Sequence, residues 1–126
     1  MRGIILVAVC LLALLAATLV GVWFICRAAE ETAAYIPGLA AAIRSEDWER
    51  ALLLYERCEA RFRAAQRWWK MMINHDDMRD VEAAFVDLRV ALENKNSFEA
   101  QKELADLKFF LEHVPDTERV NLGNVL

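Results

Sequence analysis

The residues best suited to metal chemistry are two histidines and the carboxylates beside them. Asp76 and Asp77 follow His75, and Glu112 precedes His113. Imidazole and carboxylate groups are ligands that zinc and other divalent ions accept in proteins. These residues lack a close spacing such as His-Glu-x-x-His, and the two aspartates are equally explained as charges in the first turn of a helix. We therefore assign no metal and no cofactor, and retain His75, Asp76 and His113 as candidate ligands.

The candidate nucleophiles are a cysteine and two serines. A reactive thiol needs an exposed, electropositive setting and a nearby base. Cys58 instead falls on the apolar face of a predicted helix, where a thiol behaves as a small buried hydrophobe. Ser45 and Ser97 stand at predicted helix starts, where helix capping explains them. The sequence therefore predicts no enzyme and no small-molecule substrate.

The charge of the chain argues against nucleic acid as a partner. The formal net charge is −4, and no basic cluster is flanked by aromatic side chains that would stack on bases. Nucleic-acid binding proteins carry a basic patch or stripe. We expect no nucleic-acid partner.

The first quarter of the chain is apolar. No residue from Gly3 to Cys26 is charged, and a run of more than about 18 such residues crosses the bilayer as a helix. A cleaved signal peptide is the alternative, but its apolar core is about 7–15 residues long and ends in small residues. Here the run ends in the bulky residues Trp23, Phe24 and Ile25. We predict an uncleaved, single-pass signal-anchor helix over residues 1–26, in contact with the lipid bilayer.

Two further expectations concern this membrane segment. Arg2 and the N-terminal amine oppose Arg27 across it. This balance predicts that the N-terminus lies on the cytoplasmic side of the cell membrane and that the remaining domain lies outside the cytoplasm. Ala13, Ala17 and Gly21 stand four residues apart, a spacing that lets two membrane helices approach closely. Alanine is common in such segments, so chance explains this spacing as well as a dimer face does.

A central helix is predicted from Ser45 to Ile73, with Ser45 as its N-cap. Its apolar residues recur at alternating steps of three and four, which is the seam of a helix in a left-handed bundle. The membrane helix continues the same alternation to Arg44, with a kink or short break at Pro37-Gly38. The seam of the central helix comprises Trp48, Ala51, Tyr55, Cys58, Phe62, Ala65, Trp69 and Met72.

Two more helices follow. The third has Asn74 as a candidate N-cap and the seam Met78, Val81, Phe85, Leu88 and Leu92. The fourth opens on a capping-box variant at Asn96 and Glu99, ends at Pro115, and has the seam Phe98, Leu104, Leu107, Leu111 and Val114. Short connections make successive helices antiparallel. The predicted fold is all-α: a transmembrane helix that continues into a small antiparallel (up-down) four-helix bundle over 27–114, with a tail over 115–126 that packs on the bundle.

The lengths of these helices bring the central helix back to the membrane. About twenty residues climb from Trp23 to Ser45, and the antiparallel helix returns to the interface near Trp68. Tryptophan is enriched at that depth, and cations reach lipid phosphates. We predict that Trp23, Arg67, Trp68 and Lys70 touch the interface while Trp69 belongs to the core. The alternative is that both neighbouring tryptophans are core residues.

Several short motifs together resemble a known family. They are the helix start Ser45-Glu46-Asp47-Trp48-Glu49-Arg50-Ala51, the pair Trp68-Trp69, Asn74-His75-Asp76-Asp77, the stretch 104–115 that ends in Glu112-His113-Val114-Pro115, and the closing Leu122-Gly123-Asn124-Val125-Leu126. With the N-terminal anchor, they resemble bacterial single-span membrane proteins grouped as a domain of unknown function (DUF4363). The resemblance implies a helical domain outside the membrane and carries over no catalytic residue.

The expected function follows from the anchor and the bundle. We expect a membrane-anchored, non-enzymatic structural or accessory interaction module of the cell envelope, which binds another membrane protein or itself. The alternative is a membrane-surface sensor that reads lipid or a metal ion at the Trp68/His75 end of the bundle. Leu53, Leu54 and Phe109 lie off the seams. We expect neighbouring helices to cover them, and their exposure would favour a partner.

Overall fold

The computed structural model describes the backbone of residues 1–72 and 75–125 and the side chains of residues 1–71 and 75–113. These described ranges are helical apart from short turns and contain no strand. The helices are α1 (Arg2–Ala33), α2 (Ile36–Arg44), α3 (Trp48–Met72), α4 (His75–Glu93) and α5 (Ser97–Val125).

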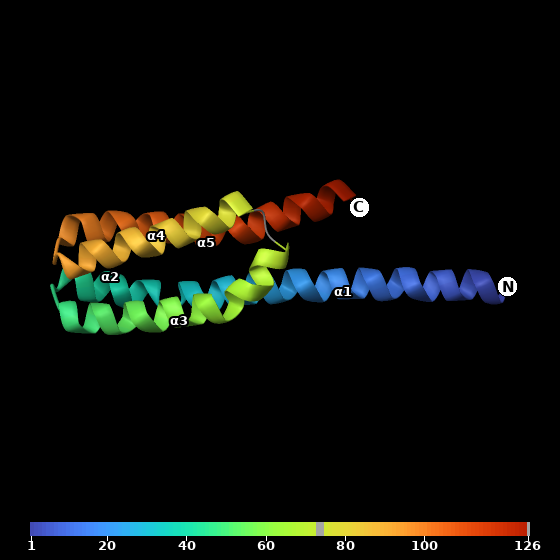
Figure 1. Ribbon diagram of the computed structural model, residues 1–126, viewed down its shortest axis with the longest axis horizontal. Coiled ribbons are helices and arrows are strands. Elements are labelled where there is room, and N and C mark those ends of the chain that lie inside the picture. The colour runs from blue at the N-terminus through green and yellow to red at the C-terminus, as the bar shows by residue number, and fades with distance from the viewer. Residues whose placement is uncertain (73–74, 126) are drawn as a thin grey trace.

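The helices form an antiparallel four-membered bundle in which α1 and α2 together make one member. Figure 1 shows α2 in line with the inner end of α1 and both lying beside α3, with α4 and α5 above them. Contacts join α1 and α2 to both α3 and α5, while α4 contacts α3 and α5. The outer part of α1 projects alone from one end of the bundle. The predicted fold class is confirmed.

The break between α1 and α2 lies one turn earlier than predicted. The two helices are separated by a turn at Ala34 and Tyr35, which both keep right-handed helical backbone angles, and Pro37 stands at the start of α2. Proline is tolerated there because the N–H that it lacks has no partner in the first turn of a helix. Gly38 lies close to α3, since a Cβ on it would be 3.3 Å from Leu54 Cδ1.

The prediction that Ser45 caps α3 is wrong. Ser45 is the C-cap of α2, and its hydroxyl donates to the carbonyl oxygens of Ala41 and Ala42 at 3.0 and 3.2 Å. The chain reverses through Glu46, whose φ is 57°. Asp47 caps α3, because its Oδ1 accepts a hydrogen bond from the N–H of Arg50 at 3.3 Å.

The turn between α4 and α5 repeats this geometry. Lys95 has φ 53°, and Asn96 Oδ1 accepts from the N–H of Glu99 at 3.1 Å, as the predicted cap requires. In both turns the left-handed residue and the residue after it donate to carbonyls in the last turn of the preceding helix, which is the Schellman arrangement. The candidate cap Asn74 lies outside the described residues, while Asp76 and Asp77 are in the first turn of α4 as predicted.

The predicted end of the last helix at Pro115 is also wrong, because the backbone of α5 continues to Val125. A proline removes only its own N–H and displaces the carbonyl four residues earlier, so it kinks a helix without having to end it. The packing of side chains 115–126 on the bundle stays a prediction.

The core follows the predicted seams closely. Six of the seam residues of α3 are at most 2% exposed, namely Ala51, Tyr55, Cys58, Phe62, Ala65 and Trp69. Phe62 stacks on Phe85 of α4 with ring centroids 4.9 Å apart and meets Trp69 edge-on at 5.5 Å. Trp48 is half-buried. Phe98 is the exception, since it is 77% exposed and Ala100 occupies the buried position instead. Met72 and Val114 lie outside the described side chains.

Candidate membrane-interface site

Helix α1 passes between two environments. Side chains from Arg2 to Val20 are exposed, whereas Ile25, Ala28 and Ala29 are at most 3% exposed inside the bundle. Within the described residues, one helical stretch is long and apolar enough to cross a membrane, and its most apolar window has a mean hydropathy of 2.9 with no residue buried. The boundary between the two environments lies near Gly21, at the base of the bundle.

Contacts between α1 and α3 fix which residues share that level. Cys58 Sγ donates to the carbonyl oxygen of Thr32 at 3.4 Å, and further toward the base Phe24 meets Trp68 edge-on with ring centroids 6.4 Å apart. Because the helices are antiparallel, Met71 lies nearly one turn further along α3, close to the level of Gly21. Helix α3 therefore reaches the base of the bundle, as its length predicted.

Among the described side chains, four large apolar ones are exposed at this base, and we call them the basal apolar surface. Trp23 is 58%, Phe24 41%, Trp68 53% and Met71 76% exposed. Trp69, next to Trp68, is completely buried. The predicted division between an outward Trp68 and a core Trp69 is thus found in the structure, while membrane contact by Trp68 stays a prediction.

Cations surround the basal apolar surface. Arg67 is exposed, and Lys70 Nζ lies 3.7 Å from Glu82 Oε1 of α4. The Arg27 guanidinium lies 5.4 Å from the Trp23 ring centroid, a cation–π distance. Sequence reasoning used Arg27 only for orientation, although its position directly after the apolar run was the available signal.

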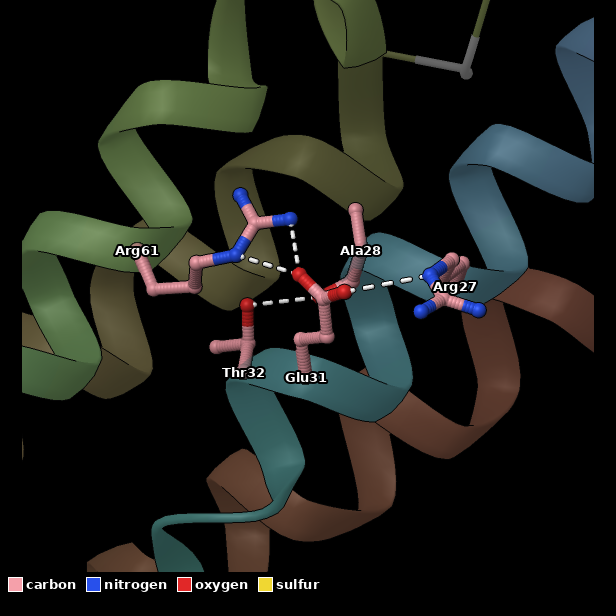
Figure 2. Close-up of polar contacts among 5 residues, drawn as sticks. All are labelled: Arg27, Ala28, Glu31, Thr32 and Arg61. Carbon is pink, nitrogen blue, oxygen red and sulfur yellow. Dashed lines mark hydrogen bonds and ion pairs between the residues drawn. The ribbon is translucent and has the colours of Figure 1, made fainter.

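A charged cluster links α1 to α3 above this surface (Figure 2). Glu31 accepts hydrogen bonds from Arg61 of α3, with Nε at 2.7 Å, and from Arg27 Nε at 3.2 Å. The hydrogen bonds from Arg61 and its positive charge hold the pKa of Glu31 below its ordinary value. Beside it, the buried Thr32 hydroxyl donates to the carbonyl oxygen of Ala28 at 2.8 Å. The spacing of Arg27 and Glu31 was visible in the sequence, but the tertiary contact to Arg61 was not.

The candidate nucleophile Cys58 is fully buried, as its seam position predicted. Burial in the apolar core, with a smaller contribution from Glu59, raises the pKa of its thiol to about 12. Such a thiol stays protonated at neutral pH, and thiols are weak nucleophiles compared with thiolates.

The candidate metal ligands occupy exposed positions around the start of α4. His75 and Asp76 are its first two residues. The ring of His113 stacks on Phe109 of α5 and lines a cavity of about 170 Å³ with Asp77 and Asp80. Antiparallel packing thus brings His113 to the first turns of α4. Among the described side chains, no three or more His, Cys, Asp or Glu residues are grouped so that they could hold a metal ion.

The three off-seam residues considered for a partner-binding surface differ in their burial. Leu54 packs against the core, but Leu53 is 48% and Phe109 62% exposed, so the expectation that neighbouring helices cover both is wrong. Both residues lie off the predicted seams, on faces of α3 and α5 that point away from the core. Ala13 and Ala17 lie on the exposed part of α1, and a dimer face there stays a prediction.

Comparison with known proteins identifies the family. A family model described as a domain of unknown function (DUF4363) matches residues 22–125, which is most of the chain. Searches of curated proteins and of solved structures found no match. The matched region begins at the base of the bundle and contains the whole of it. The chain belongs to the DUF4363 family.

Proposed function

We infer that the protein is a membrane-anchored, non-enzymatic helical bundle that serves as an accessory interaction module of the cell envelope. The observation that carries this proposal is the exposure of large apolar side chains on a bundle whose core is already complete. Each of five such side chains is at least 48% exposed, namely Leu53, Val86, Val90, Phe98 and Phe109. Exposed apolar side chains mark a partner-binding surface where several of them lie together on one face.

The anchor supports this proposal. The exposed part of α1 is apolar over Gly3–Val20, and the aromatic side chains of the basal apolar surface and the cations around that surface begin where it ends. Tryptophan and arginine are favoured at the boundary between hydrocarbon and water. In the proposed orientation the N-terminus lies on the cytoplasmic side of the membrane and the bundle lies outside the cytoplasm, where it meets another envelope protein or a second copy.

Crosslinking in native membranes tests this proposal. Lys95, Lys102 and Lys108 are exposed and accept an amine-reactive reagent. We expect a defined adduct with another protein or with a second copy, and we expect detergent dilution before crosslinking to abolish it. A chain that stays monomeric under all crosslinking conditions contradicts the proposal.

The exposed Trp68 favours a second candidate, a membrane-surface sensor that reads lipid at the base of the bundle. Brominated lipids quench tryptophan at the depth of the bilayer interface, so the full chain in nanodiscs made of them should lose part of its Trp68 emission. The quenched fraction should fall in Trp68→Phe and remain in Trp48→Phe, because Trp48 lies at the opposite end of α3. Equal quenching in Trp68→Phe and in the unsubstituted chain contradicts lipid contact.

A further inference from the structure

A groove runs along the outside of the bundle between α2 and α5. Its volume is about 510 Å³, and its apolar lining is Ala33, Ile36, Pro37, Ala40, Leu104 and Ala105. Ile36 and Leu104 are 7% and 4% exposed and form its floor. The alanines are too small to fill the space between the two helices, so the groove stays open although the core beneath it is packed.

The rims of the groove are mainly cationic. Arg44 of α2 and Lys108 of α5 line it together with Gln101 and a single acidic residue, Glu112. Arg44 and Lys108 are exposed, and among the described residues neither has an ion-pair partner. The whole chain has a net charge of −4, whereas the charged side chains that line this groove are two cations and one carboxylate, so the groove has a net positive charge.

The two cations lie at different heights above the membrane. Helix α2 ends at Arg44, at the end of the bundle where α5 begins (Figure 1). Lys108 lies seven residues beyond Gln101 along α5, which is about 10 Å nearer the membrane. Glu112 lies one turn closer still, so the charge along the groove changes from positive to negative toward the bilayer.

These charges argue against a second copy as the occupant. Two copies anchored in one membrane can be related only by a twofold axis that runs parallel to their membrane helices. Across such an axis, each residue faces residues at the same height in the other copy. A dimer through the groove would bring Arg44 toward Arg44 and Lys108 toward Lys108 of the other copy. Like charges facing each other at an interface disfavour association.

We propose that the groove binds an amphipathic α-helix of a different envelope protein, one that carries acidic residues about two turns apart. An apolar stripe with residues at i, i+3, i+4 and i+7 seats along such a groove. Two carboxylates separated by seven residues are about 10 Å apart along a helix, which equals the rise along α5 from Gln101, at the same end of the groove as Arg44, to Lys108. A cation on the partner would face Glu112 and fix its direction. This inference rests on the proposed role as an interaction module and assigns that role a site.

The test uses the full chain in nanodiscs of neutral lipid and a fluorescent, alanine-rich helical peptide with a leucine stripe and two glutamates seven residues apart. We expect saturable binding that weakens with added salt, because exposed charges are screened. A second peptide with lysines in place of the glutamates should bind at least tenfold more weakly. Equal binding of the two peptides overturns the proposal.

Variants of the chain locate the binding. Ala105→Trp fills the groove from an exposed position and should abolish peptide binding, while Ala83→Trp on the outer face of α4 should not. The pair Arg44→Glu and Lys108→Glu should weaken binding about tenfold or more, since each exposed ion pair contributes about twofold to fivefold. The matched pair Arg57→Glu and Arg79→Glu makes the same change in net charge away from the groove and should leave binding unchanged. Circular dichroism confirms that each variant is folded.

The outcomes separate this inference from the proposed function. If Ala105→Trp leaves binding intact, the peptide sits elsewhere and the groove assignment falls. A fatty acid, laurate, serves as the competitor. If laurate displaces the peptide, binds more tightly than the peptide does, and loses its binding in Ala105→Trp, then the groove binds a small amphiphile and the proposal is overturned. If the peptide fails to bind while crosslinking still yields a defined adduct, the interaction module stands and its site lies on another face.

Discussion

The two parts of α1 have similar apolar residues and opposite surroundings. Leu12 is 65% exposed in the part from Arg2 to Val20, whereas Ile25 is completely buried in the part that enters the bundle. Both avoid water, but the first is apolar and long enough for a bilayer to cover it, whereas α3 and α5 cover the second. The comparison teaches that an apolar run shows where water is excluded and that tertiary contacts decide what excludes it.

Adjacent tryptophans at the end of α3 give the sharpest form of this comparison. Trp69→Ala should lower the free energy of unfolding of the bundle by about 3 to 5 kcal/mol, because it removes a completely buried side chain that packs on Phe62. Trp68→Ala should cost clearly less than Trp69→Ala, since Trp68 is 53% exposed and meets Phe24 only edge-on. Urea unfolding of the full chain in detergent micelles, followed by circular dichroism, measures both. Equal losses would mean that Trp68 is a core residue.

A charge placed in the outer part of α1 probes the lipid side of the comparison. Leu12→Arg should raise the apparent free energy of membrane insertion by about 3 kcal/mol, the cost of an arginine in place of a leucine near the centre of a span. An insertion assay that scores glycosylation of translocated chains measures the inserted fraction. Leu53→Arg, on the exposed face of α3, is the control and should leave insertion unchanged. Normal insertion of Leu12→Arg would contradict a spanning α1.

Two threonines in α1 permit a smaller, matched test. Thr18 and Thr32 each donate their hydroxyl to the carbonyl four residues earlier, at 2.9 and 2.8 Å. Thr32 is completely buried in the bundle and Thr18 is exposed outside it. Thr32→Ala should therefore lower the unfolding free energy by about 1 kcal/mol, and Thr18→Ala should not change it. A larger effect for Thr18 would show that the outer part of α1 has protein contacts.

The smallest expected effect is the pH dependence of the link between α1 and α3. The pKa of Glu31 is held below its ordinary value of 4.5 by Arg61. Its contribution to stability is therefore fully present above about pH 4.5 and is lost as the pH falls through the lower pKa of the folded state. The unfolding free energies of the unsubstituted chain and of Glu31→Gln should differ by a constant amount at neutral pH and converge in acid. A difference that stays constant as the pH falls well below 4.5 would contradict the role of this carboxylate.

Much of the bundle was predictable because local patterns set it. The alternation of three and four identifies Tyr55, Phe62 and Trp69 as core residues, and all three are buried. The errors fall at helix ends. Ser45 and Asp47 are both good capping residues, and the choice between them depends on the left-handed Glu46, which no periodicity reveals. Pro115 was read as the end of a helix that continues past it.

The candidate sites were less predictable, because they combine residues far apart in the chain. Helix lengths were enough to bring Trp68 to the base of the bundle, since the rise per residue is fixed. They were not enough to pair Arg61 with Glu31, or to leave Phe109 exposed. The groove between α2 and α5 had no signal in the sequence, since Ala33, Ala40 and Ala105 are ordinary helix residues until two helices are placed side by side.

By itself, the sequence determined which segments are helical up to Val114, which face of each helix avoids water, and which run is apolar enough for a bilayer. These properties arise from the identity of each residue and from the fixed periodicity of the helix. The tertiary structure alone decided where α1 passes from exposed to packed, which charges meet, and where the packing leaves a groove. Each of these depends on distances between helices, and the spacing of residues along one helix contains no information about the position of another.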